Sequence, residues 1–235
     1  MGKIWAVCSG SGGVGKSTVA LSVAVGAARA GKKTILLDAS GISRSCDLIL
    51  GLESVVVLDM LDVIQDQVGI EAALYPVPQR ENLRFACASL YDHVPASELS
   101  GIVLALHAQC DVLVVDLPTG QCDLGHGVMR AGDERLIITR PDDASIRAAE
   151  RLMHRADDLA SDDLIINRVR TDRLNRKTQY TQDTVQNLLD RAALACIPED
   201  AGIPAGEQRG KAAIECSGPA WTALNRLIKS LLGGA

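Results

Sequence analysis

A short stretch near the start of the chain combines the residue types that bind phosphate groups. It reads Gly10-Ser-Gly-Gly-Val-Gly-Lys-Ser17, matches the pattern G-x-x-x-x-G-K-[ST], and lies between an apolar run and a helical pattern. Glycines let backbone N–H groups turn toward a phosphate, and the start of a helix adds a partial positive charge. Lys16 supplies a full charge for the outer phosphates, and the Ser17 hydroxyl is a typical Mg²⁺ ligand. We predict that a nucleotide contacts the following residues: Ser11, Gly12, Gly13, Val14, Gly15, Lys16, Ser17 and Thr18.

Two carboxylates are expected beside this loop because each of them ends an apolar run. Asp38 ends the run ILLD, and Asp116 ends VLVVD and is followed by Gly120. The carboxyl ends of parallel strands meet at one edge of a sheet, where carboxylates hold Mg²⁺ and its waters. We predict a Mg²⁺ site formed by Ser17, Asp38 and Asp116; the alternative for Asp116 is an ordinary strand-ending residue. We also predict catalytic roles for Lys16 and Asp38, and a contact between the Gly120 N–H and the terminal phosphate.

Apolar runs of strand length must position these residues: IWAVCS, TILLDA, LRFACA, VLVVDL, RLIITR, LIINRV and ALACIP. They lack strict alternation of apolar and polar residues, which is typical of strands covered on both faces. Helical patterns lie between them at residues 17–29, 142–159, 181–191 and 221–232. This order predicts an α/β fold: a single domain over residues 1–235 with a doubly wound, mostly parallel sheet flanked by helices. The polar segment at residues 170–183 is the one that we expect to be mobile.

The composition argues against several other classes of protein. The chain has 235 residues, a formal net charge of −5 and only 3% aromatic residues, so we expect no nucleic acid partner. No apolar run approaches the ~18 residues that a membrane-spanning helix needs. The seven cysteines form no CxxC pair, and their odd number favours reduced thiols in the cytoplasm over a disulfide framework.

An apolar stripe near the C-terminus is suited to face either a membrane or the rest of the domain. Leu224, Leu227, Ile228 and Leu231 recur at helical spacing, with only two cations beside them. A membrane-surface helix is usually richer in basic residues. We therefore predict that this helix packs on the domain, and that any membrane association depends on a partner.

Several segments, taken in order, resemble the MinD/ParA family of P-loop ATPases. The stretch GGVGKST resembles the family's deviant phosphate-binding loop, LLDASGISRSCDLILGLE its first switch and DLPTG its second switch. IITRPDDASIRAAERL resembles the strand and helix that follow, and IINRVRTD and CIPED resemble the strands that hold the base. The resemblance covers nearly the whole chain. It implies ATP or ADP with Mg²⁺, a nucleotide-dependent homodimer, and a protein regulator that reads the switches during septum placement or related intracellular positioning.

The resemblance also assigns residues to the adenine base. It implies that Asn167 contacts the edge of the base and that Arg168 belongs to the same nucleotide site. It further implies that Pro198, Glu199 and Asp200 lie against the face of the base.

Two serines depart from the family pattern. The family's loop begins with a lysine that reaches the partner's phosphates, and here the position is Ser11. The family's first switch reads D-x-D-x-G and uses its second Asp to orient the attacking water, whereas Asp38 is followed here by Ser40. Removing a cation beside developing phosphate charge typically costs ~10³ or more in rate. We predict slow or altered hydrolysis; the alternative is a non-hydrolysing, nucleotide-bound adaptor.

Two further roles are considered for residues near the switches. Arg44 is a cation that could replace the missing lysine, but loop arginines usually face solvent, and we expect this of Arg44. Iron–sulfur reductases share this fold, and Cys87 and Cys122 are the nearest counterparts of their cluster ligands. The spacing around Cys122 does not match those enzymes, so the redox reading is the weaker one.

Overall fold

The computed structural model describes residues 2–41, 44–89, 96–122, 124, 128–129, 132–154, 161–170, 172 and 179–233. These residues form an eight-stranded sheet with the order β3-β4-β2-β5-β1-β6-β7-β8. The strands are β1 Lys3–Cys8, β2 Thr34–Asp38, β3 Tyr75–Pro76, β4 Leu83–Cys87, β5 Val112–Asp116, β6 Glu134–Thr139, β7 Ser161–Val169 and β8 Ala193–Pro198. Every neighbouring pair is parallel except β3 with β4, so the predicted doubly wound, mostly parallel sheet is confirmed.

Both faces of the sheet are buried, which explains why the strand sequences show no polar alternation. In β1, Trp5 and Val7 face one hydrophobic cluster, whereas Ile4 and Ala6 face the other. All five residues of β2 and all five of β5 are buried. Side chains alternate between the two faces of a strand, so a strand between two apolar layers must be apolar throughout.

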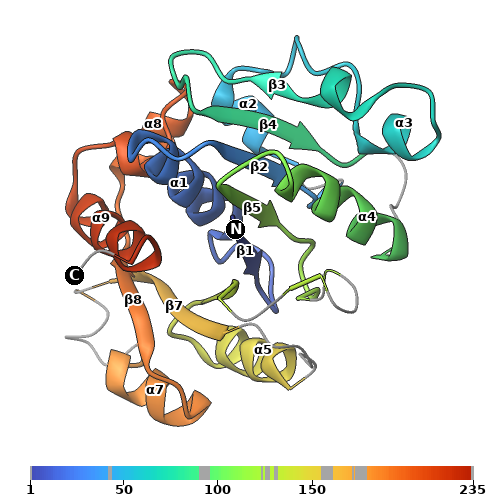
Figure 1. The fold of residues 1–235 in the computed structure, drawn as a ribbon. Helices are drawn as coiled ribbons and strands as arrows, with labels where there is room; N and C mark the ends of the chain where they lie inside the picture. Colours follow the sequence, from blue (N-terminus) through green and yellow to red (C-terminus); the bar gives the residue numbers. More distant parts are fainter. Residues whose placement is uncertain are drawn as a thin grey trace.

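Helices cover the two faces of the sheet, as Figure 1 shows. Helices α1 Lys16–Arg29 and α9 Pro219–Leu231 pack on one face, with α2 Cys46–Leu50 beside them. The other face is covered by α3 Met60–Ile64, α4 Ala96–His107, α5 Asp143–Met153 and α7 Gln182–Leu189. The short helix α8 Gly202–Glu207 and the 3₁₀ helices η2 Ile70–Ala73 and η3 Ala213–Glu215 complete the described elements.

The predicted strands and helices are found, but further elements were not predicted, among them the 12-residue helix α4. The seven predicted strands are present, and β7 begins earlier than expected because residues 161–163 pair with residues 134–136 of β6. The helix expected at 142–159 is described as far as Met153, and residues 155–160 lie outside the described residues. Half of the segment expected to be mobile, residues 171 and 173–178, also lies outside them. The elements β3, α2, α3, α4 and α8 were not predicted from the sequence.

The C-terminal helix packs on the domain, as predicted. Leu224, Leu227, Ile228 and Leu231 are all buried in the cluster that α9 shares with α1. The contact is close, since a Cβ placed on Gly26 of α1 would lie 2.1 Å from the Ile228 side chain. Among the described residues, no helix is long and apolar enough to cross a membrane.

Candidate functional site

The predicted phosphate-binding loop connects β1 to α1 at the carboxyl edge of the sheet. The strand order runs outward in both directions from β1, through β5 on one side and β6 on the other, and ligands bind at such a switch point. Gly15 caps α1 in a left-handed conformation with φ of 91°, and Gly13 has φ of 72°. No side chain caps the start of α1, and its first turn carries no acidic residue. The first N–H groups of the helix and its positive dipole end are therefore available to an anion.

The glycines of the loop fall into two kinds. A Cβ on Gly12 or Gly13 would meet no atom within 4 Å, so this part of the loop borders open space. A Cβ on Gly15, in contrast, would lie 2.3 Å from Nδ2 of Asn167. That amide donates a hydrogen bond of 2.8 Å to the carbonyl oxygen of Val14. The buried Asn167 on β7 therefore holds the back of the loop, and only glycine fits beside it.

The two predicted carboxylates lie next to each other beneath the loop. Asp38 and Asp116 are paired in register at the ends of β2 and β5, and both are fully buried. Asp38 is well supplied with donors, because Oδ1 accepts from Ser40 N and Oγ while Oδ2 accepts from Ser45 N and Cys46 N. Asp116 is held differently: its Oδ1 pairs with Lys16 Nζ at 2.5 Å.

The environment of Asp116 makes it a candidate cation ligand. Burial raises its pKa from 3.8 to about 6; the charge of Lys16 opposes this rise, and the neighbouring Asp38 adds to it. Its Oδ2 is buried without a hydrogen-bond partner among the described residues. Oxygens of Asp38 and Asp116 lie within 4.8 Å of each other and of the Cys46 sulfur. The carboxylates, together with Ser17, suit a hard divalent cation such as Mg²⁺. The Cys46 thiol has a raised pKa because it is buried, with both carboxylates adding to the rise.

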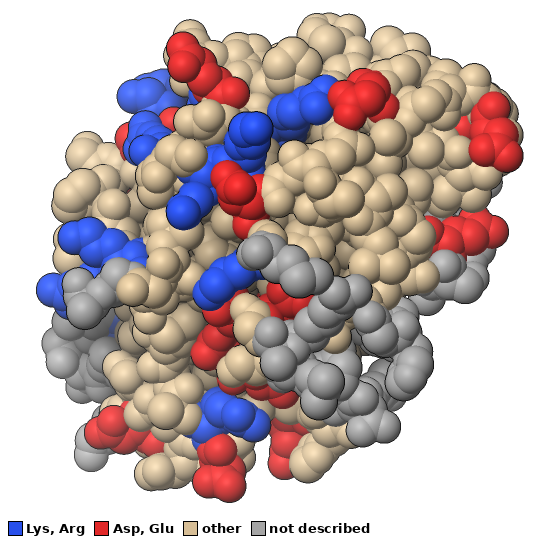
Figure 2. Space-filling model, viewed as in Figure 1, with Lys and Arg blue, Asp and Glu red and all other residues tan. Residues whose placement is uncertain are grey.

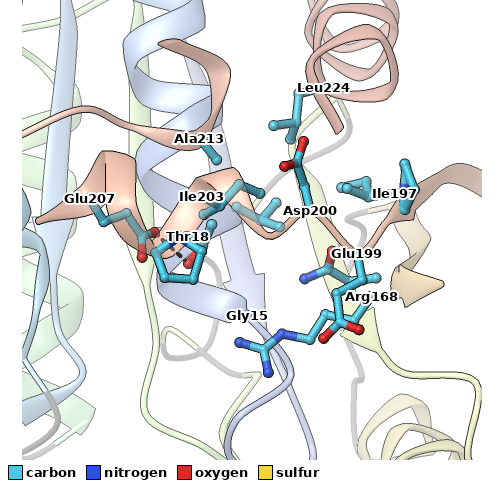
Figure 3. Close-up of a pocket in the computed structure, with 14 residues that line it drawn as sticks. Gly15, Thr18, Arg168, Ile197, Glu199, Asp200, Ile203, Glu207, Ala213 and Leu224 are labelled. Atoms are coloured by element: carbon cyan, nitrogen blue, oxygen red, sulfur yellow. Dashed lines mark hydrogen bonds between the residues drawn. The ribbon is translucent and has the colours of Figure 1, made fainter. Parts of the chain in front are cut away.

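The residues that the resemblance assigned to the base come together in one pocket beside α1 (Figure 3). Its lining contains all five of them: Asn167, Arg168, Pro198, Glu199 and Asp200. The sequence analysis missed the apolar part of the wall, which comes from Ile197, Ile203 and Leu224. It also missed Glu207, which accepts a hydrogen bond of 2.9 Å from the Thr18 hydroxyl. A lone Glu in a short, aperiodic segment gives no signal of this contact.

Two of the five residues assigned to the base, Asp200 and Asn167, already use side-chain atoms in hydrogen bonds within the protein. Both carboxylate oxygens of Asp200 accept backbone N–H groups, from Gly202 and from Ala220 at the start of α9. In Figure 3 this side chain points toward Leu224. Asn167 likewise uses its amide N–H on Val14, which leaves its carbonyl oxygen for a ligand.

The serines that depart from the family pattern both make internal contacts. Ser11 Oγ lies 3.5 Å from Ser145 Oγ on α5, and Ser40 Oγ donates to Asp38 at 2.5 Å. The Gly120 N–H, expected to contact the terminal phosphate, donates to the Ser9 carbonyl oxygen at 2.7 Å.

The expectation for Arg44 is wrong, because this residue does not face solvent. Its side chain is only 8% exposed, forms an ion pair of 2.8 Å with Asp47 and donates to the Cys87 sulfur. Asp47 lies three residues ahead on α2, a spacing that brings opposite charges together. The fold then buries the pair against β4.

The cysteines named in the redox reading are buried. Cys87 and Cys122 are 0% and 4% exposed, and Cys122 Sγ donates to the carbonyl oxygen of Leu152. Burial also raises the pKa of Cys87 to about 12, so its thiolate is disfavoured. Both side chains therefore lie below the surface of the subunit.

Charges on the face drawn in Figure 2 are mixed, with Lys and Arg interspersed among Asp and Glu. Ion pairs also join side chains from distant parts of the sequence, such as Arg80 and Glu215 at 2.6 Å.

A strand, a glycine loop, an uncapped helix start carrying Lys16 and Ser17, and two strand-end carboxylates define a P-loop nucleotide-binding protein. A family model described as ParA, NUBPL iron-transfer P-loop NTPase, matches residues 1–166. The chain is 30% identical to the septum site-determining protein MinD of Synechocystis over 90% of its length and 81% of that protein. It is 28% identical to MinD of Helicobacter pylori, covering 97% of this chain and 89% of that one. The chain therefore belongs to the MinD/ParA family of ATP-binding P-loop NTPases.

Solved structures agree with this assignment. The MinC:MinD cell division protein complex of Aquifex aeolicus matches with a TM-score of 0.86 and 27% identity, covering 99% of this chain and 96% of that one. The septum site-determining protein MinD of Pyrococcus horikoshii, complexed with Mg-ADP, shares the fold with a TM-score of 0.82. It is 24% identical and is matched over 100% of this chain and 98% of its own.

Proposed function

We propose that this chain is a single-domain, ATP- and Mg²⁺-dependent molecular switch of the MinD type with slow hydrolysis. The observation that carries the proposal is the meeting of three groups at one edge of the sheet. These are the uncapped start of α1, the Lys16–Asp116 ion pair and the Asp116 oxygen that has no hydrogen-bond partner among the described residues. Together they offer phosphate-binding N–H groups, one mobile cation and a ligand for a divalent ion.

The chain's own residues give the binding step a simple order. The loop N–H groups and Lys16 bind the phosphate chain, and the phosphates then compete with Asp116 for the charge of Lys16. Asp116, Asp38 and Ser17 would hold Mg²⁺, which would neutralise phosphate charge. The pocket beside Thr18 and Asn167 receives the base. Binding thus weakens one buried ion pair and forms two charge-assisted contacts.

Slow turnover is proposed because two hydrolytic groups are replaced by serines engaged elsewhere. Ser11 carries no charge and contacts Ser145, and Ser40 donates to Asp38. Neither can act as a cation or as a carboxylate base. In this structure the Gly120 N–H of the second switch donates to the Ser9 carbonyl oxygen. We propose that Gly120 leaves this hydrogen bond when its N–H contacts the terminal phosphate.

For partners, we propose a nucleotide-dependent homodimer and a protein regulator that reads the switch surfaces. The support is the family, whose members matched here act in septum-site determination, and the similarity to a MinC:MinD complex. We therefore propose a role in placing the division site or in a related positioning system. The expected place is the cytoplasm, with membrane contact through a partner, because the apolar stripe of α9 is buried.

A non-hydrolysing adaptor is the second candidate, and Ser40 is the observation that favours it. Ser40 is only 9% exposed, and its hydroxyl donates to Asp38 at 2.5 Å, so it is poorly placed to orient a water. In this role the bound nucleotide would be a structural part of the protein.

Single-turnover hydrolysis of labelled ATP separates the two functions. Lys16→Ala is the inactive control, since it removes the phosphate-binding cation. Turnover above this control supports the switch, whereas tight ATP binding without turnover supports the adaptor. A wild-type protein that binds no ATP would overturn both.

A further inference from the structure

Three arginines gather beside the phosphate-binding loop, and only one of them is free. Arg140, Arg168 and Arg170 border a small hollow together with Glu199. Arg140 pairs with Asp142 at 3.2 Å. Arg170 pairs with Asp172 at 3.0 Å and with Glu199 at 3.3 Å. Within the described part of the chain, the exposed side chain of Arg168 has neither an ion pair nor a hydrogen bond.

The free guanidinium is close to the loop. Its Nε lies 3.9 Å from the position that a Cβ would take on Gly15. Figure 3 shows the side chain extending from β7 toward Gly15 at the start of α1. A cation here adds to the positive field of the helix start.

The backbone around Arg168 fixes this position. The pairing of β7 with β8 is irregular between Ile166 and Val169, and Arg168 adopts a left-handed conformation with φ of 57°. Its neighbour Asn167 is anchored to Val14 of the loop. A long side chain with positive φ is uncommon and often marks a functional position.

No other cation takes this place among the residues considered for it. The loop offers Ser11 where the family has a lysine, and Arg44 is occupied by Asp47. We infer that Arg168 binds oxygens of the nucleotide's phosphate chain from within the same subunit, supplying charge that Ser11 lacks. This inference rests on the proposed function, because it requires that the loop binds ATP or ADP. It assigns Arg168 to the phosphates, not to the base.

Arg168→Asn is the variant of choice, because asparagine tolerates positive φ and so avoids backbone strain. Arg170→Asn makes the same exchange two residues further on, at a charge that is already paired. Binding of ATP, ADP and adenosine to wild type and both variants is measured by calorimetry or competition, at several salt concentrations. Thermal unfolding checks that the variants are folded.

We expect Arg168→Asn to raise the Kd for ATP and ADP by about 10- to 100-fold, the usual range for a charged hydrogen bond. The Kd for adenosine should stay within about 2-fold, and the salt dependence of ATP binding should weaken. Arg170→Asn should bind all three ligands like wild type.

Two results would overturn the inference while leaving the proposed function intact. One is an unchanged Kd for ATP in Arg168→Asn; the other is an equal loss for ATP, ADP and adenosine, which indicates a base contact or a structural role. Failure of the wild-type protein to bind ATP is a different result, because it removes the proposed function itself.

Discussion

The ammonium group of Lys16 lies 2.5 Å from Oδ1 of Asp116, so a buried ion pair connects the phosphate-binding loop to the end of β5. Lys16 is 8% exposed, and Asp116 is not exposed at all. Because a bound phosphate would compete with Asp116 for the charge of Lys16, we expect phosphate binding to weaken this ion pair. The Asp116 carboxylate is also the one that we propose for Mg²⁺. Nucleotide and cation are therefore expected to bind cooperatively.

Breaking this pair from the basic side should be costly to the fold. Lys16→Met leaves Asp116 buried without a counter-ion, and such losses typically cost 3–5 kcal/mol, so we expect about 3 kcal/mol. Urea unfolding without nucleotide measures this. Glu71→Gln is the control, because it breaks the exposed pair with Arg84 and should cost less than about 1 kcal/mol. Equal effects of the two substitutions would contradict the prediction.

The raised pKa of Asp116 predicts an unusual pH dependence. Burial, more than any other cause, brings this pKa from 3.8 to about 6 in the folded protein. The folded state therefore holds a proton that the unfolded state has lost, so this residue's contribution to stability decreases as pH rises from 3.8 to about 6. The same proton competes with Mg²⁺, so the gain in ATP affinity from Mg²⁺ should decline below about pH 6.

Two titrations check this prediction. The free energy of unfolding is measured against pH for wild type and Asp116→Asn, and the difference should change across this interval and be flat above it. ATP affinity is then measured with and without Mg²⁺ over the same range. A difference that is independent of pH would show that Asp116 has an ordinary pKa.

The sequence allowed much of the sheet to be predicted, for a clear physical reason. Strands such as β2 and β5 are apolar throughout because both of their faces are covered. A continuous apolar run can be recognised in a short stretch of sequence without knowledge of the fold. Helices of five residues such as α2 and α3 are too short to show a periodic pattern. The two-residue strand β3 is defined only by its pairing with β4.

In the candidate site, residues that belong to a local sequence pattern could be predicted, whereas contacts between residues far apart in the sequence could not. The loop residues and both carboxylates follow from a motif and from strand ends, which are local. The hydrogen bond from Asn167 to Val14 joins residues 153 positions apart, and the sequence around either residue does not predict it. Arg44 was wrongly expected to face solvent because its burial depends on where β4 lies.

The fold should depend strongly on Gly15, one of the loop glycines at which a Cβ would clash with another residue. Gly15→Ala imposes a side chain on a φ of 91° and drives it into Asn167, so we expect a loss of about 3 kcal/mol. Gly31→Ala is the matched control, since Gly31 has φ of 81° and open space around it. The control should cost about 1 kcal/mol, from the backbone alone. Equal losses in urea unfolding would show that Asn167 moves aside freely.

Glu215 should stabilise the fold by joining distant segments. Its carboxylate pairs with Arg80 at 2.6 Å and with Arg29 at 3.1 Å, and accepts the N–H of Ala212. Burial alone would raise its pKa, but Arg80, the Ala212 N–H and Arg29 outweigh it and lower the pKa below 4.5. The contribution is therefore present above pH 4.5 and is lost as pH falls through the lowered value.

Glu215→Gln removes the charge while keeping the shape of the side chain. We expect a loss of about 2 kcal/mol at pH 7, because hydrogen bonds to charged groups are worth about 1.5–3 kcal/mol. The loss should shrink as pH falls below 4.5, since the wild-type carboxylate then becomes neutral as well. Glu53→Gln on the exposed surface is the control. A loss that stays constant down to acid pH would assign the effect to packing.

Ser40→Asp restores the family's second carboxylate, and we expect it to destabilise the protein in the absence of Mg²⁺. The Ser40 hydroxyl lies 2.5 Å from Asp38 Oδ1, so the new carboxylate would face a buried one. Like charges at this distance repel, and a cost of about 2 kcal/mol would lower the Tm by about 4–8 °C. Mg²⁺ can bind between the two carboxylates, so it should recover more stability in Ser40→Asp than in wild type.

Ser40→Asn, which adds the same bulk without charge, should show no such Mg²⁺ response. Thermal unfolding with and without Mg²⁺ measures all three proteins, and an equal response to Mg²⁺ would mean that residue 40 does not face the cation site.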